Sequence, residues 1–483
     1  MNFFSPSFYA VLPEILLLSL LCFALMADVF LPERYRVATY FLVQLALVIA
    51  FLVTLPQFKT HPDPLIFLGG GYVVDDLAVI SKLFIYLFSF FAFAYAKEYV
   101  EAHKIARSEF YLLGLFSVLG MSVLVSAYNF LTIYLGLELL SLPLYAMIAM
   151  HKESQQASEA AMKYFVLGSL ASGILLYGIS FLYGMTGHIQ IDLVAHIFQT
   201  EQNAVSLLAL IFILAGILFK FGAVPFHMWV PDVYQGAPTP VTLFIASAPK
   251  VAAFAITIRF LAQAMPNLHV EWEQILIVAS ILSMFFGNLL AIAQTNLKRM
   301  FAYSSIAHIG YTLLGILAGP HSQEGYSAAM FYISTYVLVA AGAFAIITIM
   351  SRSGFEMDQL DDYRGLNARH PWLAFMMLLL LFSMAGVPPT VGFFAKLGLL
   401  EALIQSQHVP LAVFALIFAL IGAYYYLRVV MLMYFEEPTE EALQTPIIVS
   451  RDRLVMISVN GAAALILGLL PSFFIDLCRI SVG

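Results

Sequence analysis

Four charged side chains lie in the middle of segments that are otherwise apolar. They are Glu138 in YLGLELLSLP, Lys220 and Lys250 near the two ends of FKFGAVPFHMWVPDVYQGAPTPVTLFIASAPK, and Lys396 directly after GVPPTVGFFA. A charge inside a long apolar segment is costly, and it usually marks a path for ions or protons. These four residues are therefore the first candidates for chemistry.

Lysine and glutamate in such surroundings suit the transfer of protons. A low-dielectric environment disfavours the lysine ammonium, whereas a nearby carboxylate favours it. If Glu138 lies beside Lys220, the lysine holds its proton while the carboxylate is close and releases it when the carboxylate moves or is neutralised. We expect such a couple, with Lys220 as the central switch residue and with Lys250 and Lys396 as further relay groups.

A structural role is the alternative for each of these charges. Glu138, Lys220 and Lys250 could form buried ion pairs that hold helices together. Lys163 follows Glu159 by four residues, which is the spacing of an ion pair on one helix face. For Lys163, a structural pair and a proton relay therefore both remain open.

Other polar groups inside the apolar segments have weaker patterns. His227 and His308 are the histidines well inside these segments, and each is either a hydrogen-bonded core residue or a proton carrier. Lys82, Arg259 and Arg428 lie nearer to the segment ends. We expect their long stems to reach the membrane interface, with the charge in water.

The composition places the chain in a membrane. Of its 483 residues, 62% are hydrophobic and only 11% are charged, against about 25% charged in typical soluble domains. Cys22 and Cys478 form no C-x-x-C spacing, so neither a zinc nor an iron–sulfur site is indicated. The first apolar run contains Glu14 and follows no basic segment, which favours a retained first span over a cleaved signal peptide.

Apolar runs of about 20 residues predict fourteen membrane-spanning segments. The seventh and twelfth are too long and contain prolines, so we expect broken helices near Val224-Pro225 and near Val387-Pro388-Pro389. The expected spans are roughly 9–30, 37–56, 76–96, 108–127, 129–150, 157–185, 205–234, 240–264, 273–294, 298–318, 326–350, 371–405, 409–435 and 454–478.

The distribution of basic residues predicts the orientation. Only Lys59 and Arg479 lie in the even-numbered loops and ends. By the positive-inside rule the odd-numbered loops are cytoplasmic, and both termini lie on the periplasmic side. Thirteen basic residues lie in the loops after odd-numbered spans: Arg34, Arg36, Lys97, Lys104, Arg107, Lys152, Lys298, Arg299, Arg352, Arg364, Arg369, Arg451 and Arg453.

The layout of the spans indicates an internal repeat. Spans four to eight and nine to thirteen are sets of five, and an odd number makes the second set enter the membrane from the opposite side. The fourth helix of each set is the broken one and has a lysine nearby, an arrangement typical of an ion site near the midplane. We therefore divide the chain into a three-helix segment (1–107), a first repeat (108–264), an inverted second repeat (265–435) and a C-terminal helix (436–483).

Four long motifs resemble the antiporter-like membrane subunits of respiratory complex I, the NADH-quinone oxidoreductase. They are LGLELLSLPLYAM, KFGAVPFHMWVPDVYQGAPTPVTLF, LKRMFAYSSIAHIGY and FSMAGVPPTVGFFAK. The resemblance covers nearly the whole chain and implies an all-α protein of fourteen helices with two inverted repeats. It also implies that Glu138, Lys220, Lys250 and Lys396 form the proton path, with His227 and His308 at polar family positions.

The resemblance further implies a multi-pass subunit of the bacterial inner membrane that pumps protons with its enzyme complex. Its partners would be other membrane subunits, including neighbouring antiporter-like ones. NADH, FMN, iron–sulfur clusters and quinone would belong to other subunits, with no cofactor in this chain. Two features separate it from its larger relatives: the sequence ASAPKVA replaces an HAATMV-like run, and the chain ends at Gly483 without a lateral helix.

Two other functions fit less well. A subunit of an Mrp-type cation/proton antiporter or of a membrane-bound hydrogenase would share the fold and the charged residues. A haem- or quinone-binding redox enzyme would need paired axial histidines on facing helices. Only His227 and His308 lie well inside spans, so the redox class is disfavoured.

Overall fold

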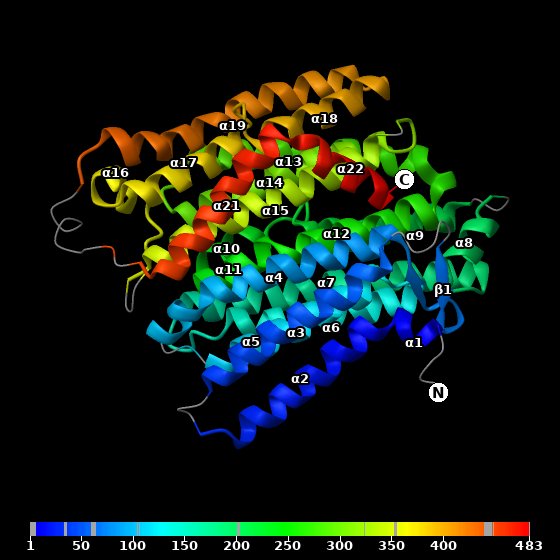
Figure 1. Ribbon diagram of the computed structural model, residues 1–483. Coiled ribbons are helices and arrows are strands. Elements are labelled where there is room, and N and C mark those ends of the chain that lie inside the picture. The colour runs from blue at the N-terminus through cyan, green and yellow to red at the C-terminus, as the bar shows by residue number, and fades with distance from the viewer. Residues whose placement is uncertain are drawn as a thin grey trace.

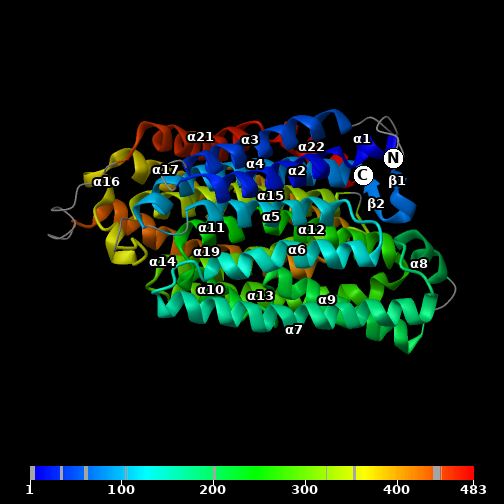
Figure 2. The same cartoon turned by 90° about the horizontal axis from the view of Figure 1, so that it is seen from below.

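The computed structural model is a bundle of long, nearly parallel helices (Figures 1 and 2). It describes residues 6–32, 36–58, 64–103, 105, 107–199, 203–322, 324–351, 355–438, 447 and 449–482. Of the residues used to predict orientation, Arg34, Lys59, Lys104, Arg352 and the terminal Gly483 lie outside this part of the chain.

The secondary structure of the described residues is almost entirely helical. The only sheet among them is an antiparallel pair, in which Ile66 of β1 faces Val73 of β2. The elements are α1 (Pro6–Ala10), α2 (Leu12–Phe30), α3 (Val37–Thr54), η2 (Leu55–Gln57), β1 (Leu65–Phe67), η3 (Leu68–Gly70), β2 (Tyr72–Val74), α4 (Asp76–Ala102), α5 (Arg107–Val125), α6 (Phe130–Ile148), α7 (Gln155–Thr186), α8 (Ile191–Ile197), α9 (Ala204–Phe221), α10 (Trp229–Gly236), α11 (Thr239–Ala246), α12 (Ala248–Ile258), η4 (Arg259–Ala264), η5 (Pro266–Leu268), α13 (His269–Ile292), α14 (Leu297–Ala318), α15 (Gly325–Met350), η6 (Leu360–Tyr363), α16 (Leu366–Arg369), α17 (Pro371–Ala385), α18 (Val391–Gln405), α19 (Val409–Phe435), α21 (Arg451–Leu469) and α22 (Pro471–Val482).

The helices confirm the prediction of fourteen spans. Thirteen helical segments of the described chain are long and apolar enough to cross a membrane, and the shorter α17 continues after a break into α18 as the remaining span. The chain is therefore a multi-pass membrane protein. All residues in the most apolar stretch of Thr239–Ala264 are buried, whereas only 28% of those in the corresponding stretch of Leu12–Phe30 are buried. The eighth span therefore lies in the core of the bundle, and the first span lies at its periphery, facing the bilayer.

Both predicted helix breaks are present. Helix α9 ends at Phe221, and Gly222 follows with φ of 75°, a left-handed conformation that glycine adopts without strain. Helix α17 ends at Ala385, and Gly386 has φ of 84°. Each break also contains a cis peptide bond, Val224-Pro225 in the first and Pro388-Pro389 in the second.

The two five-helix sets begin with matching pairs of closely packed helices. In the first pair, a Cβ atom added to Gly120 of α5 would lie 2.3 Å from the backbone nitrogen of Leu140 of α6. In the second pair, a Cβ atom added to Gly287 of α13 would lie 2.6 Å from the backbone nitrogen of Ala307 of α14. Small residues thus allow close backbone approach at equivalent places in both sets.

A third break lies in the eighth span, just before Pro249. Helix α11 ends at Ala246, Ser247 has φ of −109° and ψ of −106°, and α12 starts at Ala248. Proline lacks an N–H and its ring clashes with the carbonyl four residues earlier, here that of Ile245. The helix is therefore interrupted just before Pro249, and Lys250 lies in the first turn of the second half.

The two ends of the bundle differ. Helices α1 and α22, at the two ends of the described chain, lie at the same end together with β1 and β2 (Figures 1 and 2). Helix α16 and the loops after odd-numbered spans lie at the opposite end, which we call the basic end because it carries Lys298, Arg299, Arg364 and Arg369.

Candidate functional site

Serine side chains contact both Lys220 and Glu138, and Ser141, Ser172 and Lys220 line one small cavity. The Lys220 Nζ atom donates a hydrogen bond of 2.7 Å to the Ser141 hydroxyl, and the Ser172 hydroxyl donates to a carboxylate oxygen of Glu138. Ser141 lies one turn after Glu138 on α6. Among the described residues no ion pair joins Glu138 directly to Lys220, and the expected couple is indirect.

Lys250 lies at the broken end of α9. Its Nζ atom donates a hydrogen bond of 2.5 Å to the carbonyl of Phe221, the last residue of that helix, and lies 5.6 Å from the centroid of the Trp229 ring. The C-terminal end of a helix carries partial negative charge and favours a cation. Lys220 is close enough to Lys250 for the two ammonium groups to repel each other, so protonation of one disfavours protonation of the other.

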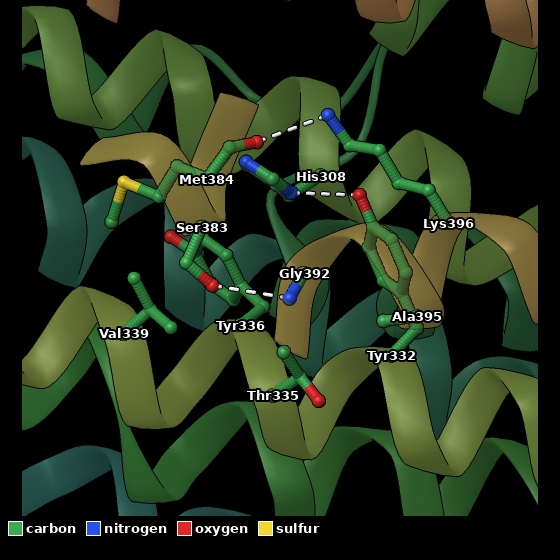
Figure 3. A pocket seen from close by; sticks show the side chains of 10 residues that line it. All are labelled: His308, Tyr332, Thr335, Tyr336, Val339, Ser383, Met384, Gly392, Ala395 and Lys396. Atoms are coloured by element: carbon green, nitrogen blue, oxygen red, sulfur yellow. Dashed lines mark hydrogen bonds between the residues drawn. The ribbon is translucent and has the colours of Figure 1, made fainter. Parts of the chain in front are cut away.

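Lys396 has the matching position in the second repeat. Its Nζ atom donates to the carbonyl of Met384 at 3.0 Å (Figure 3). It also donates to the carbonyl of Ala385 at 2.8 Å, and these two are the last residues of α17. The Tyr311 ring centroid lies 5.7 Å from the same nitrogen. Each broken helix therefore ends in backbone carbonyls that accept a hydrogen bond from a lysine of another helix.

His308 is held between tyrosines in the interior of the second repeat. Its Nδ1 atom lies 2.7 Å from the Tyr332 hydroxyl, its Nε2 atom lies 3.0 Å from the Tyr426 hydroxyl, and its ring stacks on Tyr336. His308 and Lys396 line one cavity (Figure 3). Both ring nitrogens thus have hydroxyl partners, which is the arrangement that lets an imidazole accept a proton on one side and release one on the other.

His227 and Lys163 lie apart from these groups. His227 is half-buried in the broken segment between α9 and α10, and its Nδ1 atom has no hydrogen-bond partner among the described residues. Lys163 makes the predicted ion pair with Glu159 at 2.8 Å and a second one with Asp232 at 2.7 Å. Its side chain is 43% exposed, so these contacts favour the structural interpretation of Lys163.

The prediction that Lys82 and Arg259 reach the membrane interface is wrong. Lys82 is buried and pairs with Glu14 at 2.7 Å, and Arg259 is buried and forms two hydrogen bonds with Asp75 at 2.5 and 2.7 Å. A buried charge needs a partner, and both partners come from distant parts of the chain. Glu14 and Lys82 each lie near the start of an odd-numbered span, hence at similar depth, and that signal could have predicted their pair.

The polar partners of the candidate residues were not predicted. Ser141 contacts Lys220 and Ser172 contacts Glu138, and Tyr332 and Tyr426 flank His308. Serine and tyrosine are common in apolar helices, so their spacing alone gave no signal. No group of three or more histidine, cysteine or acidic side chains that could hold a metal ion occurs within the described residues.

Comparisons with known proteins identify the family of this chain. Residues 127–422 match the family model described as NADH:quinone oxidoreductase/Mrp antiporter, transmembrane. The chain is 49% identical, over 99% of its length and 98% of the relative, to the NADH-quinone oxidoreductase subunit N of Thioalkalivibrio sulfidiphilus. It is 50% identical, over 99% of its length and 98% of the relative, to the NADH-quinone oxidoreductase subunit N of Thiobacillus denitrificans.

Solved structures show the same fold. A chain of respiratory complex I from Thermus thermophilus with bound aureothin superimposes with a TM-score of 0.83 at 33% identity, covering 97% of this chain and 99% of that one. A chain of the Mrp complex of a Dietzia species shares the fold, with a TM-score of 0.85 at 21% identity, covering 98% of this chain and 97% of that one. The chain therefore belongs to the NADH:quinone oxidoreductase/Mrp antiporter family of membrane proteins, in the group of NADH-quinone oxidoreductase N subunits.

Proposed function

We propose that this chain moves protons across the membrane as a subunit of an NADH-quinone oxidoreductase. The observation that carries the proposal is the pair of lysines at the two helix breaks, Lys250 on the carbonyl of Phe221 and Lys396 on the carbonyls of Met384 and Ala385. Two protonatable groups, each held by backbone at the centre of a repeat, are what a proton path through inverted repeats requires.

Charge repulsion provides a way to pass the proton. A proton that arrives on Lys220 disfavours the ammonium of Lys250, because the two charges lie close together in a region of low dielectric. A negative charge on Glu138 stabilises the proton on Lys220, and neutralising Glu138 removes that stabilisation. A change at Glu138 therefore shifts the proton from Lys220 toward Lys250.

The second repeat would continue the path. His308 exchanges protons between its two tyrosine partners, and the shared cavity brings it next to Lys396. Glu138, Lys220, Lys250, His308 and Lys396 are thus the proposed proton path. His227 and Lys163 would have supporting roles, His227 in the break between α9 and α10 and Lys163 in an exposed ion-pair network.

The setting of this activity follows from the relatives. As an N subunit, the chain would work with other membrane subunits of the complex, including neighbouring antiporter-like ones. It would take part in a translocase whose NADH, FMN, iron–sulfur and quinone chemistry belongs to other subunits. We place it in the inner membrane of a bacterium with both termini periplasmic. A reporter fused after Gly483 that is accessible only from the cytoplasm would contradict this orientation.

An Mrp-type antiporter or a membrane-bound hydrogenase is the second candidate. The Mrp chain shares the fold at 21% identity, which is evidence for the fold alone. The full-length identity of 49% to an N subunit favours the oxidoreductase. Subunits recovered by gentle purification distinguish the two functions, because only the oxidoreductase brings a peripheral arm that oxidises NADH.

Lys220 tests the proposed path in the intact complex. Lys220→Ala removes the exchangeable proton, and proton pumping driven by NADH in membrane vesicles should fall strongly. Lys220→Arg keeps the positive charge, but a guanidinium does not release its proton in proteins. A relay therefore fails with arginine, whereas a structural ion pair survives. Full pumping by an assembled Lys220→Arg complex would show that Lys220 is structural.

A further inference from the structure

At the basic end of the bundle, one carboxylate accepts hydrogen bonds from three hydroxyl groups that lie far apart in the sequence. Glu356 accepts hydrogen bonds from the hydroxyls of Tyr99 on α4, Thr239 on α11 and Ser351 after α15, the second at 2.7 Å and the third at 3.3 Å. The His103 Nε2 atom lies 4.0 Å from the same carboxylate. The Glu356 side chain is 31% exposed, so it reaches both water and the protein interior.

The charge of Glu356 suits the capture of protons. Burial raises the pKa of Glu356, but the Lys298 ammonium and the hydroxyls of Tyr99 and Thr239 lower it by more, so the net pKa lies below its ordinary value. Glu356 is therefore an anion at neutral pH. Lys298 is buried beside it and donates a hydrogen bond of 3.0 Å to the carbonyl of Ala237.

Helix α14 carries a polar stripe from this cluster into the membrane interior. Lys298, Ser305, His308 and Thr312 are separated by seven, three and four residues, which places them on one face of the helix. All four side chains are buried. Buried polar side chains on one face of α14 thus extend from the basic end of the bundle to His308.

Beside this stripe lies a group of hydroxyls that we call the hydroxyl file: Tyr234, Ser305 and Tyr336. The Tyr234 and Tyr336 side chains both lie close to the Ser305 hydroxyl. The Tyr234 and Ser305 hydroxyls are buried, and neither has a hydrogen bond of normal geometry in the described part of the chain. A buried hydroxyl without a protein partner is a place where ordered water is needed. Thr242 of α11, the helix that also carries Thr239 of the Glu356 cluster, donates a hydrogen bond to the backbone carbonyl of Tyr234, so Tyr234 lies beside that helix.

The inner end of the hydroxyl file reaches the candidate site. The Tyr336 ring stacks on His308 with centroids 4.7 Å apart. Tyr336, Thr335 and His308 line the same cavity as Lys396 (Figure 3), and the Thr335 hydroxyl is also buried without a partner among the described residues. Polar groups therefore follow one another from Glu356 to Lys396.

We propose that Glu356 takes up protons at the basic end and that the hydroxyl file, with intervening water, delivers them to His308 and Lys396. This inference rests on the proposed function, since it supplies the protons that the path moves. Glu356 gains a proton and becomes a neutral carboxylic acid. Each hydroxyl or water then accepts one proton on its oxygen and releases its own to the next. His308 accepts at one ring nitrogen and releases from the other, and no electron moves.

The test uses the intact complex in membrane vesicles, with NADH-driven pumping measured per complex assembled. Glu356→Gln keeps the size of the side chain but accepts no proton, and we expect pumping to fall about tenfold. Glu356→Asp keeps the carboxyl and should restore most of the rate. Asp361→Asn is the matched control, because Asp361 is an exposed carboxylate of the same loop that pairs with Arg364, and it should pump normally.

Tyr234→Phe separates a proton path from a structural effect. It removes only a hydroxyl without a partner in the described chain, so a purely structural account predicts no loss, whereas the file predicts a several-fold loss of pumping. Normal pumping by Glu356→Gln, or by Tyr234→Phe, overturns the inference. If Lys220→Ala abolishes pumping while Glu356→Gln pumps normally, only this inference fails. If Lys220→Ala also pumps normally, the proposed function itself fails.

Discussion

Gly386→Ala should displace Lys396 while leaving the fold intact. A Cβ atom at this position would lie 2.9 Å from Cδ and 3.2 Å from Nζ of Lys396. Both atoms belong to the far end of a flexible side chain, so the lysine moves and the backbone stays. The left-handed conformation of residue 386 adds a strain of about 1–2 kcal/mol for alanine, which a large membrane protein tolerates.

The functional loss should be larger than the loss of stability. Moving the ammonium away from the carbonyls of Met384 and Ala385 gives up two hydrogen bonds to a charged group, each contributing about 1.5–3 kcal/mol. A proton carrier misplaced by about 1 Å can lose about a hundredfold in rate. We therefore expect NADH-driven pumping by the Gly386→Ala complex to fall by about tenfold or more.

Gly398→Ala is the matched control, on the helix α18 that carries Lys396. A Cβ atom at Gly398 would meet nothing within 4 Å, and alanine favours the helix, so this variant should assemble and pump as the parent does. Assembly of both variants is measured on native gels, and pumping is measured in vesicles at equal complex content. Equal pumping by the two variants would refute the argument that Lys396 must lie on the end carbonyls of α17.

Two further predictions concern stability. Lys82→Met leaves the buried Glu14 carboxylate without its ion-pair partner and should destabilise the protein by about 3–5 kcal/mol, and adding Glu14→Gln should recover part of that loss. Thermal dissociation of the complex measures the stability of both variants, and strictly additive losses would contradict a buried pair. Burial, together with the nearby carboxylates of Asp358 and Asp361, raises the pKa of Asp362 to about 6. The protonated form of Asp362 therefore contributes stability below pH 4, and this contribution is lost as the pH rises through about 6. Asp362→Asn should therefore raise the melting temperature above pH 6, by less than about 1 kcal/mol in free energy after screening by solvent, and should give no gain at pH 4.

The spans and breaks could be predicted because each depends on local sequence. Hydropathy over about 20 residues identifies a span, and proline removes a helical hydrogen bond wherever it occurs. The breaks near Pro225 and Pro388 follow from these two effects. Pro249 gave the same signal, but the shift of the interruption to Ser247 depends on how α11 packs in the core, and that is a property of the tertiary structure.

The pairing of charges could not be predicted in the same way. Arg259 binds Asp75 across a separation of 184 residues, and the interface position that we expected for Arg259 assumed that no partner was available. Burial of Lys82 follows from the same cause, since Glu14 neutralises it. For Lys220 the partner was foreseen in Glu138, but the hydrogen bond of Lys220 to Ser141, one turn along the helix that carries Glu138, was not.

The two repeats reach the same arrangement with lysines from different places. The ammonium at the end of α9 comes from Lys250 on the next span, whereas the ammonium at the end of α17 comes from Lys396 on the second half of the same broken helix. Sequence comparison of the repeats therefore shows no matched lysine, although both satisfy the partial negative charge that a helix leaves at its broken end. What the repeats share is the left-handed glycine that exposes the carbonyls, Gly222 in one and Gly386 in the other. The glycines and the carbonyls before them define the site, and each repeat brings a lysine to it by a separate route.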